Sequence, residues 1–159
     1  MTQHVWRIGT DTPDYEAHDL SGKGAEKTGG RWNRKGLPVI YSASSIALAC
    51  LETVVHLEAK GLPMNRFLVR IDIPDSVWRA RVEMPASTLK VGWTALPSGR
   101  VSLDAGDAWL KGGAQALMLV PSVIVPEEWN VLINPQHADA KKISATKLRP
   151  WVYDSRLGV

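Results

Sequence analysis

Cysteine and phenylalanine each occur only once, and no apolar run approaches the length of a membrane-spanning helix. The single Cys50 excludes an intrachain disulfide and a zinc site built from several cysteines, and its neighbours Leu48 and Leu51 predict a buried, unreactive thiol. Residues 1–19 join no basic segment to an apolar stretch and a cleavage site, so no export signal is expected. We therefore expect a cytoplasmic protein with no membrane segment.

The familiar cofactor, metal and hydrolase motifs are also missing. The four histidines are scattered, with no spacing typical of metal ligands. Lys27 stands where a dinucleotide fingerprint starting at Gly22 requires its third glycine, and no apolar strand precedes it. Gly30 and Arg31 follow Gly29 where a phosphate-binding loop requires lysine and then serine or threonine. No G-x-S-x-G elbow occurs. We expect no metal and no bound cofactor.

The sequence does contain enough apolar material for one core. Hydrophobic residues make up 45% of 159 positions, which fits a single domain over residues 1–159. The net charge of +3 is mild. A basic nucleic-acid-binding module or an RNA-cleaving toxin remains an alternative, but it would need clustered lysine and arginine among exposed aromatics, or a histidine acid/base pair, and neither is visible.

Short strand patterns dominate, and they do not alternate regularly with helices. This favours an α+β fold with mainly antiparallel strands. Residues 9–28 are polar and read as a loop, and a short helix is expected at 103–111. Residues 77–82 are expected to pair with the strand at 66–73. The predicted strands are 4–8, 39–41, 66–73, 116–120, 123–125, 131–133 and 148–153.

The clearest helix pattern covers residues 45–59, SIALACLETVVHLEA, with Ser44 or Ser45 as its cap and Gly61 and Pro63 as stop signals. Apolar residues lie on opposite sides of this helix, which predicts that it is buried. Glu52 lies at the edge of its main apolar face. A carboxylate there needs a partner, and a buried ion pair with Arg31 would satisfy that need as well as a catalytic role would.

Three more polar residues stand at the ends of apolar segments or beside glycines. Arg31 follows two glycines and offers a planar fork for phosphate oxygens, although a surface arginine beside a turn would look the same. Tyr41 ends a short strand and is either core or a ring that stacks on a nucleobase or nicotinamide. Ser122 lies between two apolar runs, where turn capping is the plain alternative.

These residues occur within a series of motifs that resembles the RES-domain toxins, a family named for its Arg, Glu and Ser. The motifs are WRI at 6–8, GGRWN at 29–33, IYSA followed by a helix with LET at 51–53, PS at 121–122 and WNVLINP at 129–135. The naming positions would be Arg31, Glu52 and Ser122. The resemblance implies an ADP-ribosyltransferase-like fold, with small antiparallel sheets packed against helices around a cleft for NAD.

The resemblance also implies that the toxin depletes NAD by cleaving its nicotinamide N-glycosidic bond, with water or phosphate as acceptor and NAD as substrate rather than cofactor. A helix-turn-helix antitoxin of the Xre type would cover the cleft. In this mechanism Glu52 accepts a hydrogen bond from the ribose 2′-OH and faces the cationic transition state.

The remaining candidates would bind and orient NAD. Arg31, with Arg7 as second candidate, would hold the pyrophosphate, and Tyr41 would stack on the nicotinamide. Ser122 would orient the ribose or the catalytic carboxylate, with Asn134 as a weaker member of the same group.

The nearest rival activity is ADP-ribosyl transfer to a protein or nucleotide in the same cleft. Many protein-modifying enzymes of that fold carry a second Glu or Gln two residues before the catalytic Glu. That place would be Cys50, which favours hydrolysis or phosphorolysis over transfer.

Overall fold

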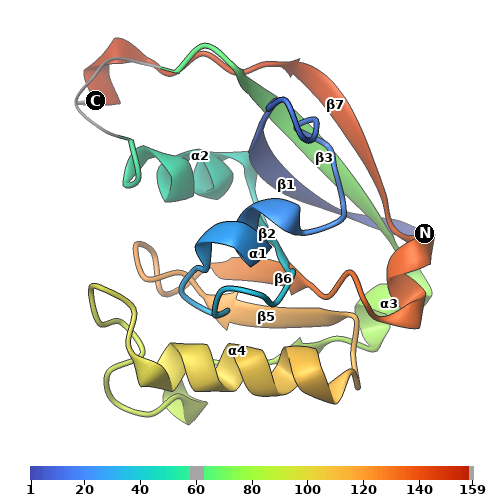
Figure 1. The fold of residues 1–159 in the computed structure, drawn as a ribbon, viewed down its shortest axis with the longest axis vertical. Helices are drawn as coiled ribbons and strands as arrows, with labels where there is room; N and C mark the ends of the chain where they lie inside the picture. Colours follow the sequence, from blue (N-terminus) through green and yellow to red (C-terminus); the bar gives the residue numbers. More distant parts are fainter. Residues whose placement is uncertain (58–62, 158–159) are drawn as a thin grey trace.

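The computed structural model describes residues 1–57 and 63–157, which form one mainly antiparallel sheet with helices packed against it (Figure 1). The strands are β1 Thr2–Thr10, β2 Ile40–Ala43, β3 Arg66–Pro74, β4 Val82–Glu83, β5 Leu117–Pro121, β6 Trp129–Ile133 and β7 Ser144–Pro150. The helices are α1 Lys23–Thr28, α2 Ile46–Val54, α3 Asp75–Arg79 and α4 Arg100–Gly112, with 3-10 turns at Ala86–Thr88, Ala138–Lys142 and Ser155–Leu157.

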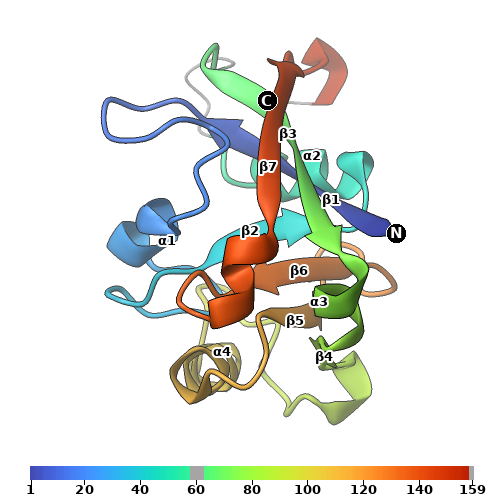
Figure 2. The ribbon, with the colours of Figure 1, turned by 90° about the vertical axis from the view of Figure 1, so that its right-hand side faces the viewer.

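The strand order β4-β5-β6-β2-β1-β3-β7 divides the sheet into two halves. β1 and β3 pair along their whole length, whereas β1 and β2 are joined by the single pair Trp6 and Ala43. Figure 2 shows the consequence: β3 and β7 run across the direction of β5 and β6. The predicted α+β class is confirmed, and the small antiparallel sheets expected from the resemblance are the two halves of one hydrogen-bonded sheet.

Each half of the sheet carries a helix over the same face. On β5 and β6, the buried Met118 and Leu132 pack in a cluster with Trp109 of α4. On β1 and β3, Ile8 and Leu68 pack with the buried part of α2. On β2, Tyr41 and Ala43 point to this same face. Tyr41 packs in the cluster with α4, and Ala43 packs in the cluster with α2. The join between the halves therefore lies between α2 and α4.

The opposite face holds the largest apolar cluster. It contains Val69 and Ile71 of β3 and Val131 and Ile133 of β6, all buried, and in β3 this follows the predicted alternation. The apolar side chains of both halves therefore meet in one core, which holds the two halves at a fixed angle.

Several local predictions are wrong, for reasons of tertiary packing. Residues 23–28 of the expected 9–28 loop form α1. Residues 77–82 do not pair with β3: α3 occupies 75–79, and Val82–Glu83 pairs in parallel with β5. The 123–125 run is not a strand, because its amides turn back onto Ser122. Apolar β-branched residues in such short runs do not by themselves select a strand.

Element ends also differ from the predictions. The last strand is Ser144–Pro150 rather than 148–153, and α4 is longer at both ends than the predicted 103–111. Ser45 caps α2 by accepting a hydrogen bond from the Leu48 amide at 3.1 Å, as one of the two predicted caps. In the described residues α2 ends at Val54, and residues 58–59 of the predicted helix lie outside them.

In the described ranges 1–57 and 63–157, every helix is too short or too polar to span a membrane.

Candidate active site

Glu52 on α2 receives two hydrogen bonds on the same oxygen. The Ser122 hydroxyl donates to Oε1 at 2.7 Å, and the Asn130 amide donates to Oε1 at 2.8 Å. The donors come from residues 70 and 78 positions further along the chain. These contacts supply the partners that a carboxylate on an apolar helix requires.

Ser122 is itself held in one orientation. It is fully buried at the end of β5, and its oxygen accepts the Ile124 and Val125 amides, both at 3.1 Å. A hydroxyl has one proton to donate, and with its oxygen used by two amides that proton points to Glu52. Of the two tasks predicted for Ser122, the structure shows the contact with the carboxylate.

Arg31 lies on the loop that follows Gly29 and Gly30, and its guanidinium reaches across to a distant segment. Nη1 donates to the carbonyls of Trp93 at 3.0 Å and Ala95 at 2.9 Å. Partial burial lowers the pKa of Arg31, and the nearby Glu52 charge acts in the opposite direction. The described residues show no Arg31–Glu52 ion pair, so the simple structural pairing considered for Glu52 is wrong.

The loop that carries Arg31 is held by Tyr41. The Tyr41 hydroxyl donates to Asn33 Oδ1 at 2.6 Å and accepts from the Trp32 amide at 3.0 Å. Burial raises the pKa of Tyr41, so the phenol stays protonated. A Cβ at Gly30 would lie 2.7 Å from the Tyr41 hydroxyl oxygen, so this position needs glycine. Only the ring of Tyr41 is left for contact with a ligand.

Helix α4 holds the same loop from the other side. Arg34 donates through Nη1 to Asp107 at 2.7 Å and through Nη2 to Asp104 at 2.8 Å, and its backbone amide also binds Asp107 at 3.0 Å. Asp107 is nearly buried. The loop therefore presents Arg31 from a fixed support rather than from a mobile connection.

The two remaining candidates lie in different places. Arg7 donates from Nη1 to the Tyr41 carbonyl at 3.3 Å, its Nε is buried without a partner, and burial lowers its pKa. It therefore lies beside β2, next to the join between the halves. Asn134 is not brought to Glu52: its amide binds the Leu110 carbonyl at 3.2 Å and accepts from the Gln136 amide at 3.1 Å.

Sequence reasoning missed Asn130 and selected Asn134 from the same WNVLINP motif. The two lie at opposite ends of β6, and only the Trp129 end reaches α2. The available signal was a polar residue directly beside the predicted strand 131–133, and both asparagines have it. Nothing local distinguishes the two asparagines, because which end of the strand faces α2 is set by the sheet order.

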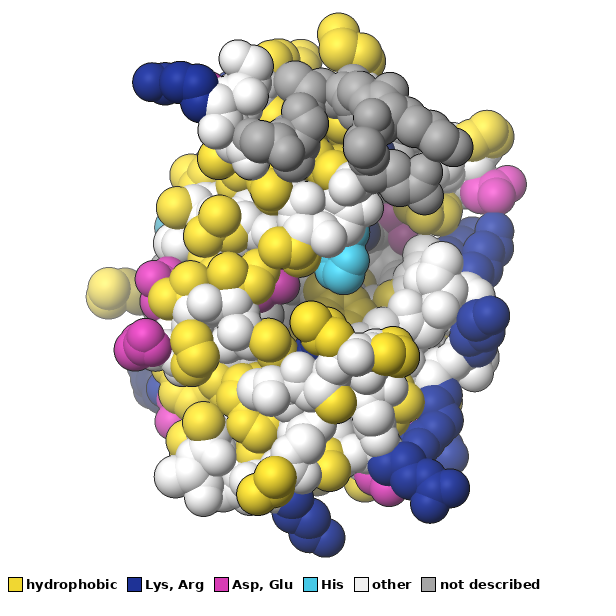
Figure 3. All heavy atoms as spheres, turned by 90° about the vertical axis from the view of Figure 1, so that its left-hand side faces the viewer, with side chains coloured by type: hydrophobic (Ala, Val, Ile, Leu, Met, Phe, Trp, Pro, Cys, Tyr) yellow, Lys and Arg dark blue, Asp and Glu magenta, His cyan; other side chains and the backbone are white. Residues whose placement is uncertain are grey.

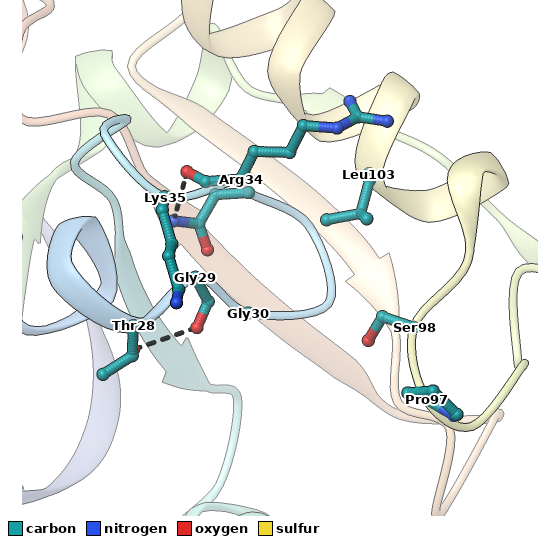
Figure 4. Close-up of a pocket in the computed structure, with 9 residues that line it drawn as sticks. Thr28, Gly29, Gly30, Arg34, Lys35, Pro97, Ser98 and Leu103 are labelled. Atoms are coloured by element: carbon teal, nitrogen blue, oxygen red, sulfur yellow. Dashed lines mark hydrogen bonds between the residues drawn. The ribbon is translucent and has the colours of Figure 1, made fainter.

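A cavity of about 370 Å³ adjoins the Arg31 loop (Figure 4). It lies between the loop and the start of α4 and is lined by Thr28, Gly29, Gly30, Asn33, Arg34, Lys35, Pro97, Ser98 and Leu103. Figure 3 shows a hollow near the middle of one face of the molecule, with hydrophobic side chains below it and a histidine and acidic side chains at its rim. Within the described chain, no three acidic, histidine or cysteine side chains come together as a metal site would require.

The sequence belongs to a known family. The RES domain family model matches residues 4–154, so the chain belongs to the RES-domain family of toxins, as its motifs indicate. It is 57% identical over 157 residues to the Prs ADP-ribosylating toxin of Sphingobium sp. (strain YBL2), covering 99% of this chain and 98% of that protein.

Two proteins named Toxin Res are more distant relatives. The protein from Yersinia enterocolitica is 36% identical over 90% of this chain and 93% of its own length. The protein from Pseudomonas putida is 38% identical over 96% of this chain and 98% of its own length.

Proposed function

We propose that this RES-domain protein cleaves the bond between nicotinamide and ribose in NAD, with Glu52 as the catalytic carboxylate. The observation that carries the proposal is the pair of neutral donors on Glu52 Oε1, from Ser122 and Asn130. Neutral donors hold the carboxylate in place and leave its negative charge uncompensated. A lysine or arginine partner would compensate that charge. A fixed negative charge is what a cationic sugar transition state requires.

The reaction breaks one bond at C1′ of the ribose and forms another at the same carbon. The C1′–N bond breaks and its electron pair stays on nicotinamide, which leaves as a neutral molecule. The ribose gains oxocarbenium character, and Oε2 of Glu52 stabilises it through the 2′-OH and its own charge. A water oxygen then bonds to C1′ and loses a proton, which gives ADP-ribose. If phosphate takes the place of water, its oxygen bonds to the same carbon and the product is the 1-phosphate of ADP-ribose.

The dinucleotide is held by the arginines. Arg31 uses Nη1 for the two carbonyls, which leaves Nε and Nη2 for a pyrophosphate oxygen. Arg7 has a buried Nε with no protein partner, a costly arrangement that a bound anion relieves. The Tyr41 ring stacks on nicotinamide, since its hydroxyl is already engaged by the Arg31 loop.

Release of nicotinamide from NAD by the purified chain tests this proposal. Glu52→Gln keeps the shape of the side chain and removes its charge, so we expect the fold to be kept and kcat to fall by roughly 100-fold or more. Arg31→Ala mainly raises KM for NAD. A Glu52→Gln protein that releases nicotinamide at the wild-type rate would contradict the mechanism.

ADP-ribosyl transfer is a second candidate, favoured by the name of the Sphingobium relative. The absence of an acidic residue at position 50 does not argue against it. Glu52 lies on helix α2, where residues two apart point to different sides, whereas residues two apart on a strand share a face. The discrimination drawn from Cys50 therefore has no geometric basis in this fold. Label from NAD on a protein would identify transfer, and free ADP-ribose or its phosphate would identify NAD degradation.

We further propose that a cognate antitoxin of the Xre type covers the site. Exposed Val55 follows α2, and exposed Ile124 follows Ser122, so apolar side chains flank the Glu52 contacts. Co-expression with the antitoxin should protect these side chains from solvent and block nicotinamide release. Expression of the chain alone should lower cellular NAD and stop growth.

A further inference from the structure

We propose that Asn130 is a positioning residue that, together with Ser122, clamps Glu52 in its working orientation. The proposal rests on the proposed function of Glu52. Both donors bind Oε1, at 2.8 Å from Asn130 and 2.7 Å from Ser122. The terminal torsion of a glutamate is soft, so one donor would leave the carboxylate free to rotate about that contact. Two donors on one oxygen fix the plane and present Oε2 to the substrate.

The support of the clamp is rigid. Asn130 lies within β6, in register with Ala43 of β2 on one side and Val120 of β5 on the other. Ser122 directly follows β5, which pairs with β6 up to Pro121 and Trp129. Asn130 therefore stands on β6 and Ser122 directly after the neighbouring β5, where the Ser122 amide donates to the Glu128 carbonyl at 3.0 Å, so the sheet sets the separation of the two donors.

A comparison of the asparagines supports a functional role for Asn130. Asn33 and Asn134 are buried, and each has both its amide ends bound within the protein. Asn130 donates to Glu52, but its Oδ1 is buried without a partner. An unpaired buried acceptor costs free energy, so an asparagine kept only for stability would be expected to satisfy it. The orientation of Asn130 is set by Glu52.

The test compares matched substitutions in steady-state NAD cleavage. Asn130→Asp keeps the size of the side chain, removes the amide donor and adds a charge that repels Glu52. We expect kcat to fall on the order of 100-fold with KM for NAD within about twofold, because the reacting group is misplaced while binding is kept. Asn65→Asp is the control: it removes an amide that donates to the Asp11 carbonyl at 3.0 Å, outside the proposed site, and should leave kcat unchanged.

A double-mutant cycle in unfolding separates the clamp from the proposed activity. Asn130→Ala, Glu52→Ala and the double variant are unfolded in urea, and we expect their effects on the unfolding constant to deviate from additivity by at least about threefold. Wild-type kcat in Asn130→Asp, or additive effects in the cycle, would overturn the clamp. If the wild type released no nicotinamide while the cycle showed coupling, the proposed function would fail and the clamp would stand.

Discussion

Gly106 in α4 packs tightly against the loop that carries Arg31. A Cβ at this position would lie 1.6 Å from the Trp32 carbonyl oxygen and 2.6 Å from its carbonyl carbon. Real Cβ atoms essentially never come within 3.0 Å of a non-bonded heavy atom. Gly106→Ala must therefore move helix and loop apart by at least 1.4 Å, the difference between 3.0 and 1.6 Å. Both contacts are with backbone, so no change of rotamer relieves them.

The expected cost of Gly106→Ala follows from this displacement. Overpacking a tight contact costs about 1–3 kcal/mol, and we expect the upper end because backbone must move. At about 2–4 °C per kcal/mol for a chain of this length, Tm should fall by roughly 6–12 °C. Arg31 immediately precedes Trp32, so the same shift moves its guanidinium, and we expect KM for NAD to rise about 10-fold.

Gly112→Ala on the same helix is the control. A Cβ at Gly112 has nothing within 4 Å, so the substitution brings only the higher helix propensity of alanine. We expect a gain of about 0.5–1 kcal/mol, a Tm higher by roughly 1–4 °C, and unchanged KM. For both variants, Tm is measured by differential scanning calorimetry and KM by NAD cleavage. If Gly106→Ala matched the wild type in Tm and KM, the close packing of loop on helix would be refuted.

Two further predictions concern the loop and acid stability. Tyr41→Phe keeps the ring but leaves the Trp32 amide without its partner, so we expect a loss of about 1–3 kcal/mol in urea unfolding and a smaller rise in KM than for Tyr41→Ala. The pKa of Asp11 is lowered chiefly by a hydrogen bond from Lys147, so its contribution to stability is present at neutral pH and is lost as the pH falls below about 4. Wild type should be more stable than Asp11→Asn at pH 7, and the difference between their urea midpoints should disappear as the Asp11 carboxyl group is protonated in acid.

Local patterns predicted much of the fold. The alternation in β3 and the Ser45 cap of α2 can be read from neighbouring residues, because strand periodicity and helix capping depend on interactions within a few positions. The same reasoning failed for α3 and for residues 123–125, where a short apolar run was shaped by the elements it packs against.

The family can be read from the sequence alone, and so can the unusual position of Glu52, a carboxylate on an apolar helix. What Glu52 contacts depends on the tertiary fold. Its donors Ser122 and Asn130 are 70 and 78 residues away, and the sheet order brings the ends of β5 and β6 to α2. The same order takes Asn134 to the other end of β6. Hydrogen bonds act over about 3 Å, whereas residue spacing in a chain does not specify which distant segments approach within that distance.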